Sequence, residues 1–305
     1  MGKKDVEKNI PANHSLSWTL DHLCTEVQLE LSSAQQDEWQ PLDSEFPFEM
    51  SVKGKEKYLN HAQRVKSECG LTQSFIIRSA NYFPADCGIA SSASSFAALT
   101  EAICVASKDL GGKDLGVQEK SLLSARGSGS SCRSFMPGFV EWQESSLNIF
   151  ESPFKNLVHM VVLVGAGAKK VSSSDAHKKV STSLLYEGRI DRANNRLEQL
   201  KKSLLDKNWK QAFEITWAEF WDMHALFETS EPAFGYYLPD SFAVLNKARR
   251  FWEENNDGPL VTMDAGPNVH LLWREEQKDQ AQKFYTQEIQ SQWQCLHNFE
   301  GESLV

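Results

Sequence analysis

The sequence predicts an α+β fold of two mixed lobes with a cleft between them. Strand-like stretches dominate the first half of the chain, long helical patterns dominate the second, and short strand-like stretches return near the end. A doubly wound parallel sheet would instead alternate strands and helices throughout. The 305 residues are enough for two small domains, which we expect at 1–165 and 166–305.

The first half contains four expected strands and one expected helix. Apolar and polar side chains alternate over 15–20 and 26–31, as they do in strands of a half-buried sheet. The stretch 72–80 has a similar character, and 155–165 is apolar enough to be a buried strand. A helix is expected from about Ile89 to Ser107, after a polar turn.

The second half is expected to be mainly helical. Aromatic and apolar side chains recur every three or four residues from Trp209 to Phe227, which predicts one face of a long helix. His224 falls on this face, and we expect a packed core histidine there rather than a ligand. Further helices are expected over 174–187, 193–205, 239–255 and 275–292. Two short strands, in GPLVTM and VHLLW, are expected on either side of a DAGPN turn.

The composition limits the classes of function. A net charge of −9 argues against a general nucleic-acid binder. No apolar run reaches the roughly 18 residues of a membrane span, and the six cysteines form no CxxC pair, which favours reduced thiols in a cytoplasmic protein. Basic residues occur in small local clusters that suit a small anionic ligand, although each cluster alone is compatible with solvated surface charge. These clusters are Lys3 with Lys4, Arg126 with Arg133, and Lys169 with Lys170.

A first chemical motif is the stretch NYFPADCGIASSASSFAAL. Pro84 and Gly88 mark a turn, and small residues, among them Ala90, Ser91 and Ser92, then open an apolar helix. A helix start presents unpaired N–H groups and the positive end of the helix dipole, and small side chains let an anion approach. The stretch is a candidate phosphate cradle, although it lacks the Lys-Ser/Thr of the common P-loop. Tight packing alone would also favour small residues here.

A second motif is the stretch ARGSGSSCRS, which is too polar for a core. Gly127 and Gly129 free the backbone, and Arg133 supplies a planar group suited to a carboxylate or phosphate. The hydroxyl groups belong to Ser128, Ser130 and Ser131. A flexible surface loop would have a similar composition.

A third motif, TMDAGPNVHLLW, places Asp264 between a short strand and a Gly-Pro turn. A carboxylate there can form the turn, act like a helix cap, or serve as a catalytic base on a rigid element. Together the three motifs can hold a polyphosphate, hold an anionic substrate and move a proton. That combination is typical of phosphoryl transfer, in which positioning and charge stabilisation carry most of the catalysis.

These stretches resemble motifs of diphosphomevalonate decarboxylases, in the family's order. NYFPADCGIASSASSFAAL is similar to N-N-F-P-T-A-A-G-L-A-S-S-A-A-G, ARGSGSSCRSFMPGFVEW to R-x-G-S-G-S-A-C-R-S...G-G-F-V-x-W, and MDAGPNVHLLW to D-A-G-P-N-A-V-L. KNIPANHSLSWTL and AKKVSSSDAHKKVSTS resemble the family's L-N-L-P-x-N-S-S-I-S-V-T-L strand and K-x-x-S-S-T-x-G-M...V-x-T-S segment. The resemblance runs from about Gly2 to Trp273.

The resemblance implies a GHMP kinase-like α+β fold, with an ATP-binding, ribosomal protein S5 domain 2-like N-terminal lobe and a ferredoxin-like C-terminal lobe. It implies ATP- and Mg²⁺-dependent decarboxylation of (R)-5-diphosphomevalonate to isopentenyl diphosphate, in isoprenoid biosynthesis. The 3-hydroxyl is phosphorylated first, and phosphate and carbon dioxide are then lost. A cytoplasmic homodimer without nucleic-acid or membrane partners is expected on the same basis.

The resemblance also assigns residues. Asp264 is the catalytic carboxylate that acts on the 3-hydroxyl, and Arg133 binds the substrate carboxylate. Substrate contacts are expected from Lys3, Asn9, Lys57, Ser128, Gly129, Ser130, Ser131 and Cys132. The ATP phosphates are expected at Pro84, Gly88, Ala90, Ser91 and Ser92. No side chain is assigned as a metal ligand.

The resemblance breaks at the start of the chain. Met1-Gly2-Lys3 aligns with the W-G-K that ends the family's A-P-x-N-I-A-x-I-K-Y-W-G-K segment, so a family strand and an active-site Lys fall before Met1. We expect a start assigned too late, and a degenerate relative is the alternative. Competing hypotheses are a catalytically inactive ATP-binding protein, a decarboxylase or 3-kinase of 5-phosphomevalonate or mevalonate, and a structural protein with coincidental Ser-rich loops.

Overall fold

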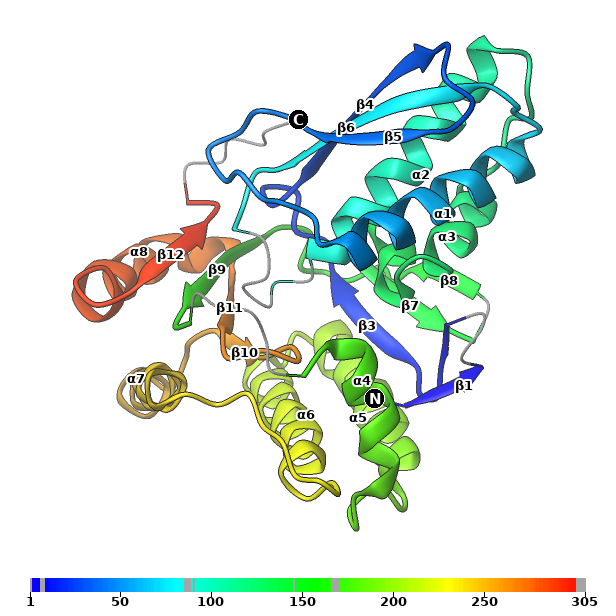
Figure 1. Cartoon of the computed structure of the whole chain (residues 1–305). Helices are drawn as coiled ribbons and strands as arrows, with labels where there is room; N and C mark the ends of the chain where they lie inside the picture. Colours follow the sequence, from blue (N-terminus) through cyan, green and yellow to red (C-terminus); the bar gives the residue numbers. More distant parts are fainter. Residues whose placement is uncertain are drawn as a thin grey trace.

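The computed structural model describes residues 2–5, 9–84, 89, 91–144, 146–165 and 171–299. Two lobes follow one another along the chain, and each combines sheets with helices, as the predicted α+β arrangement requires (Figure 1). In the described residues, the first lobe carries two three-stranded sheets, one two-stranded sheet and three α-helices. The second lobe is built on a four-stranded sheet.

The main sheet of the first lobe has the order β4-β6-β5, with β4 antiparallel and β5 parallel to the central strand. Its strands are β4 (Thr25–Ser32), β5 (Glu38–Pro41) and β6 (Ser74–Asn81). Helices α1 (Val52–Cys69), α2 (Ser91–Asp109) and α3 (Val117–Ala125) lie on one side of this sheet (Figure 1). Alternate residues of β6, Phe75 and Ile77, share a buried cluster with Leu99 and Ile103 of α2.

Helix α1 was missed by the sequence analysis, although its ends carry clear signals. The Ser51 hydroxyl accepts a hydrogen bond from the Gly54 N–H at 3.1 Å, and Gly70 ends the helix with a φ of 76°. Its buried residues include Tyr58, Ala62, Val65 and Cys69. This stripe is narrow and the rest of the helix is polar, so the apolar pattern is weak.

The Ser-rich segment, ARGSGSSCRS (Ala125–Ser134), lies between α3 and β7, and most of it forms a 3-10 helix, η1 (Gly129–Phe135). A three-stranded sheet with the order β3-β7-β8 follows it, formed by β3 (Ser15–Trp18), β7 (Phe139–Gln143) and β8 (Ser146–Ile149). At the start of the chain, β1 (Lys3–Asp5) pairs antiparallel with β2 (Ile10–Pro11). The Ser-rich segment is therefore mostly helical from Gly129 onward and not a flexible loop throughout.

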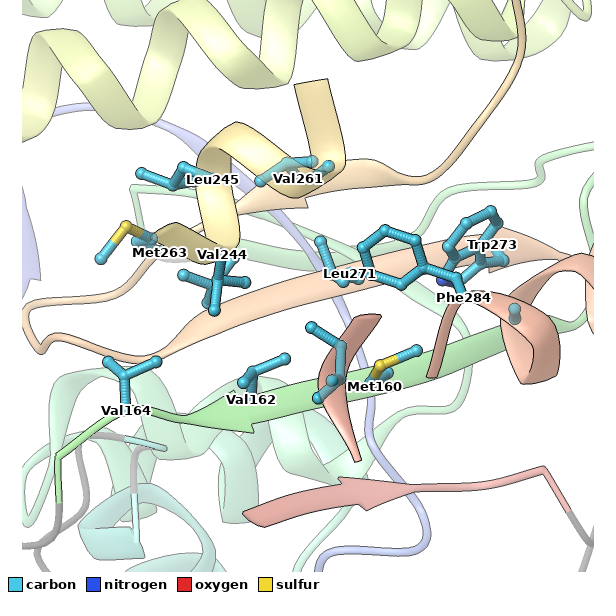
Figure 2. Close-up of a cluster of buried hydrophobic side chains, with 14 of the residues drawn as sticks. Met160, Val162, Val164, Val244, Leu245, Val261, Met263, Leu271, Trp273 and Phe284 are labelled. Carbon is cyan, nitrogen blue, oxygen red and sulfur yellow. The ribbon is translucent and has the colours of Figure 1, made fainter. Parts of the chain in front are cut away.

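The second-lobe sheet is antiparallel, with the order β10-β11-β9-β12. Its strands are β9 (Leu157–Leu163), β10 (Leu260–Thr262), β11 (Val269–Arg274) and β12 (Gln294–His297). Figure 2 shows Met160 and Val162 of β9 with Leu271 of β11, all on the face that packs against α7 and α8. Strand β9 falls before residue 165 yet pairs with strands that fall after it. A domain division at residue 165 therefore stays a proposal.

The helices of the second lobe correct two predictions. They are α4 (Ser173–Lys179), η2 (Val180–Thr182), α5 (Arg189–Leu205), α6 (Trp209–Glu228), α7 (Pro239–Asn255), η3 (Glu275–Gln277), α8 (Lys278–Phe284) and η4 (Tyr285–Ile289). The helix expected over 174–187 ends early, because Ser183 is extended and its hydroxyl accepts from the Leu185 N–H at 3.1 Å. The helix expected over 275–292 breaks into η3, α8 and η4 before the chain turns into β12. None of the described helices is long and apolar enough to cross a membrane.

Candidate active site

The start of α2 and the Ser-rich segment lie together. The Ser92 and Ser128 hydroxyl oxygens are 3.3 Å apart. Ser91 opens α2, a helix of 19 residues whose first turn supplies free N–H groups and the positive end of the dipole. The first two motifs of the sequence thus form one polar surface. Pro84 lies just before this region, whereas Gly88 and Ala90 lie outside the described residues.

Asn81, the last residue of β6, is hydrogen-bonded to the N-terminal part of α2. Its side-chain oxygen accepts hydrogen bonds from the Thr25 hydroxyl at 2.7 Å and from the Ser95 hydroxyl at 3.3 Å. Asn81 is buried at the end of β6, and Ala93 is buried in the first turn of the helix. The helix start is therefore fixed to the sheet, and a bound phosphate would meet donors already in place.

The Ser-rich segment is anchored by its buried members. The Ser131 hydroxyl donates to the Ser128 carbonyl at 2.6 Å and accepts from the Ser124 hydroxyl at 2.6 Å. The Cys132 thiol donates to the Gly129 carbonyl at 3.3 Å, and burial raises its pKa to about 11. Since both side chains are fully buried, they hold the segment from inside. Ser128 and Ser130 stay partly exposed.

Arg133 is presented from η1 on an aromatic support. Its guanidinium donates to the Ser15 hydroxyl at 2.8 Å and lies 5.9 Å from the centre of the Trp142 ring. Ser15 and Trp142 pair across β3 and β7, so the small sheet positions both contacts. Among the described residues no carboxylate forms an ion pair with Arg133. Its charge is therefore available to an anionic ligand.

Lys3 and Asn9 attach the start of the chain to the same segment. The Lys3 ammonium donates to the Asn9 side-chain oxygen at 2.5 Å. The Asn9 amide in turn donates to the carbonyls of Ala125 at 2.9 Å and Arg126 at 3.2 Å. Asn9 adopts a φ of 57°, a left-handed conformation that asparagine tolerates better than most residues.

Positive charge gathers around these groups. Desolvation of its ammonium by neighbouring protein groups, followed by repulsion from Lys3, lowers the pKa of Lys57 of α1. Nearby His61 is buried, and its pKa falls to about 3 through burial and then through the charges of Arg64, Lys57 and Arg126. This field favours binding of anions over cations.

The Asp264 carboxylate is exposed, whereas its backbone is held firmly. The Asp264 carbonyl accepts from His224 Nε2 at 3.0 Å and from the Gly266 N–H at 2.8 Å. The Ser241 hydroxyl of α7 donates to the Pro267 carbonyl at 2.7 Å. Burial lowers the pKa of His224 to about 4, so this ring is neutral near pH 7. His224 is a core histidine, as predicted.

Packing between the lobes sets how the motifs face one another. Phe83, just before the proposed phosphate loop, and Ile89, within it, share a buried cluster with Val161 and Leu163 of β9. Strand β9 pairs with β11, which pairs with β10, the strand that leads to Asp264. Asp264 is held by its backbone contact with His224 in the second lobe, and Arg133 is held by its contact with Ser15 in the first.

Several supporting residues were missed by the sequence analysis. Ser15 and Trp142 hold Arg133, and Phe96 packs so closely on Gly127 that a Cβ there would overlap its ring. These residues come from β3, β7 and α2, and no residue pattern predicts their contacts with the Ser-rich segment. All three lie in stretches that resemble family motifs, but the resemblance assigned them no role. Ser15 lies in KNIPANHSLSWTL, Phe96 in NYFPADCGIASSASSFAAL and Trp142 in ARGSGSSCRSFMPGFVEW.

Comparisons with known proteins agree over nearly all of the chain. Residues 1–150 match the family described as diphosphomevalonate decarboxylase-like N-terminal domain, and residues 159–303 match the mevalonate 5-diphosphate decarboxylase C-terminal domain. A solved mevalonate diphosphate decarboxylase from Legionella pneumophila is 40% identical with a TM-score of 0.90, over 97% of this chain and 95% of that one.

Two further relatives are more distant. The diphosphomevalonate decarboxylase of Candida albicans is 29% identical over 91% of this chain and 81% of that protein. A solved structure titled MDDEF in complex with MVAPP, AMPPCP and magnesium is 28% identical with a TM-score of 0.84, over 96% of this chain and 90% of that one.

Proposed function

Because this chain belongs to the diphosphomevalonate decarboxylase family, we propose that it converts (R)-5-diphosphomevalonate to isopentenyl diphosphate with ATP and Mg²⁺. The observation that carries the proposal is Arg133, a cation without a described carboxylate partner, beside hydroxyls that meet the start of α2. This surface suits a substrate that bears both a carboxylate and phosphates. A homodimer in the cytoplasm belongs to the same proposal.

The described residues are compatible with ATP and Mg²⁺. The start of α2 offers N–H donors, and the Ser92 and Ser128 hydroxyls face one another there. No group of three or more His, Cys, Asp or Glu side chains in the described residues is arranged to hold a metal ion. Mg²⁺ usually keeps several waters and binds through phosphates with one or two side chains, so its binding does not require such a group. When bound, Mg²⁺ would neutralise phosphate charge.

Asp264 and Arg133 divide the chemistry between the lobes. Asp264 would take the proton of the 3-hydroxyl as that oxygen attacks phosphorus, because its carboxylate is exposed on a fixed turn. Arg133 would hold the substrate carboxylate in line with the bond that breaks. Ser128 and Ser130 would contact the polar groups between them. Ser131 and Cys132 would keep the segment in shape.

The proposal is tested by measuring carbon dioxide and ADP released from (R)-5-diphosphomevalonate with ATP and Mg²⁺. We expect equal amounts of both products from the wild type. Arg133→Leu should release no carbon dioxide while keeping its fold, since the side chain is only partly buried. Arg78→Leu is the matched control, because this Arg pairs with Glu30 on β4, away from the site.

Two outcomes would contradict the proposal. Unchanged carbon dioxide release by Arg133→Leu would remove Arg133 from the reaction. ATP binding by the wild type without any turnover would favour the alternative of an inactive nucleotide-binding protein, and calorimetry with ATP would detect it.

A further inference from the structure

Helix α6 packs against β10 (Figure 1), and it forms a hydrogen bond with the chain at each end of this strand. Just before β10, the indole N–H of Trp209 donates to the Gly258 carbonyl at 2.7 Å. Just after β10, Nε2 of His224 lies 3.0 Å from the Asp264 carbonyl oxygen. Both donors are buried side chains of one helix, and both acceptors are backbone carbonyls. Of the two acceptors, only Asp264 is a proposed site residue.

The contact with Asp264 determines which nitrogen of His224 carries the proton. A carbonyl oxygen only accepts hydrogen bonds, so Nε2 must be the donor. Burial lowers the pKa of His224 to about 4, so near pH 7 the ring is neutral and Nδ1 carries no proton. The Tyr237 and Phe227 rings hold the imidazole in place, with centres at 4.6 and 5.1 Å from its own. The donor is therefore fixed before any substrate binds.

The position of the Asp264 carbonyl decides where the carboxylate of the same residue lies. Pairing of β10 with β11 fixes the chain before Asp264. The carbonyl after Cα accepts from His224 and from the Gly266 N–H at 2.8 Å. Gly266 belongs to the same turn and moves with it, whereas His224 ties the turn to α6. Because the chain is fixed on both sides of a tetrahedral Cα, the Cα–Cβ bond has one direction.

We propose that His224 is a positioning residue, which holds the Asp264 carboxylate toward the substrate 3-hydroxyl by fixing the carbonyl of the same residue. The inference rests on the proposed function, which makes Asp264 the base. A base must lie within hydrogen-bond reach of the proton that it takes, and a displacement of about 1 Å can cost about 10²-fold in rate. Trp209 forms the same kind of bond at the other end of β10, so its loss should affect stability alone.

The test compares His224→Leu with Trp209→Phe, its matched control. Each substitution removes one ring N–H that donates to a backbone carbonyl, and each should lower the free energy of unfolding. His224→Leu should also lower kcat by about 10²-fold, with KM for ATP unchanged because the ATP phosphates are proposed at α2. Trp209→Phe should keep the wild-type kcat. His224→Gln should restore most of the loss, because its Nε2 lies as many bonds from Cβ as that of histidine.

Rates are measured at a temperature at which every variant is folded. If His224→Leu does not fold, His224→Asn replaces it, because the shorter amide does not reach the carbonyl. A kcat equal to that of Trp209→Phe would overturn the role of His224, and so would a His224→Gln variant no more active than His224→Leu.

Crystal structures of the wild type and the His224 variant separate failure of this inference from failure of the proposed function. A wild type without turnover contradicts the proposed function, whereas the position of the Asp264 carboxylate can be compared without any reaction. A displaced carboxylate in the variant would support the role of His224. A carboxylate in the same position in both structures would overturn it.

Discussion

At the scale of single residues, the site separates side chains that meet the ligand from side chains that hold the backbone. Asp264 exposes its carboxylate while its carbonyl accepts two hydrogen bonds. Ser131 and Cys132 show the opposite arrangement, because their side chains are buried and bonded within the segment. Replacing the first kind should change activity, and replacing the second kind should change stability.

Asp264→Asn is the clearest residue-scale prediction. The amide keeps the size and backbone contacts but cannot accept a proton, so kcat should fall by about 10³-fold. The free energy of unfolding should change little, since the side chain is exposed. ADP release in a coupled assay measures kcat, and urea unfolding measures the free energy of unfolding.

Asp279→Asn provides the control for that experiment. Asp279 is another exposed carboxylate of the second lobe, in the first turn of α8. Its variant should retain wild-type kcat. Substantial turnover by Asp264→Asn would show that the proton leaves by another route.

At the scale of elements, the Ser-rich segment depends on its close approach to α2. A Cβ at Gly127 would overlap the Phe96 ring, whereas one at Gly116 would meet its nearest neighbour, the Glu119 carboxylate, at 3.4 Å. Gly127→Ala should therefore lower the free energy of unfolding by about 1–3 kcal/mol through overpacking. It should also raise KM for ATP, because Ser128 would move away from Ser92.

Gly116→Ala is the matched control, with an expected loss below about 1 kcal/mol. Thermal and urea unfolding compare the stabilities of the two variants, and ATP titrations of the reaction rate compare their KM for ATP. If the two variants had equal free energies of unfolding, the Ser-rich segment would accommodate the Gly127 methyl group without loss of stability. That result would contradict a role for the close packing of Gly127 on Phe96.

At the scale of the whole molecule, histidines join the lobes. His159 of β9 lies 3.1 Å from His22 of the first lobe and 3.0 Å from His270 of β11, measured between ring nitrogens. Burial lowers the pKa of all three, to about 4 for His22. These rings are therefore neutral in the folded protein near pH 7, and adding a proton to any of them is disfavoured.

This arrangement predicts acid sensitivity. The unfolded chain takes up protons on histidine below about pH 6.5, and the folded chain resists this until about pH 4 for His22, so stability falls as pH drops between these values. His22 alone should account for about 2 kcal/mol of that loss by pH 5. Urea unfolding from pH 8 to 5 measures how steeply the free energy of unfolding falls as the pH drops. This slope should be shallower in His22→Gln. Identical slopes would assign the acid sensitivity to other groups.

Much of the fold was accessible from the sequence because local patterns determine it. The 3.6-residue spacing of aromatic side chains predicted α6, and the run 155–165 predicted β9, since both patterns reflect which face of an element is buried. Element ends depend on caps and on partners elsewhere, so the helix expected over 174–187 was too long. Strand β12 was missed because its identity comes from pairing with β9.

The sequence alone determined the family and the residue types of the site, because motifs such as DAGPN and GSGSSCRS are contiguous and distinctive. Only the tertiary structure decided which of their side chains face outward, what supports Arg133, and that the backbone of Gly2 contacts His177 of the second lobe. The physical reason is distance along the chain. Contacts between residues more than a hundred positions apart arise from how the lobes pack, and no local pattern carries them.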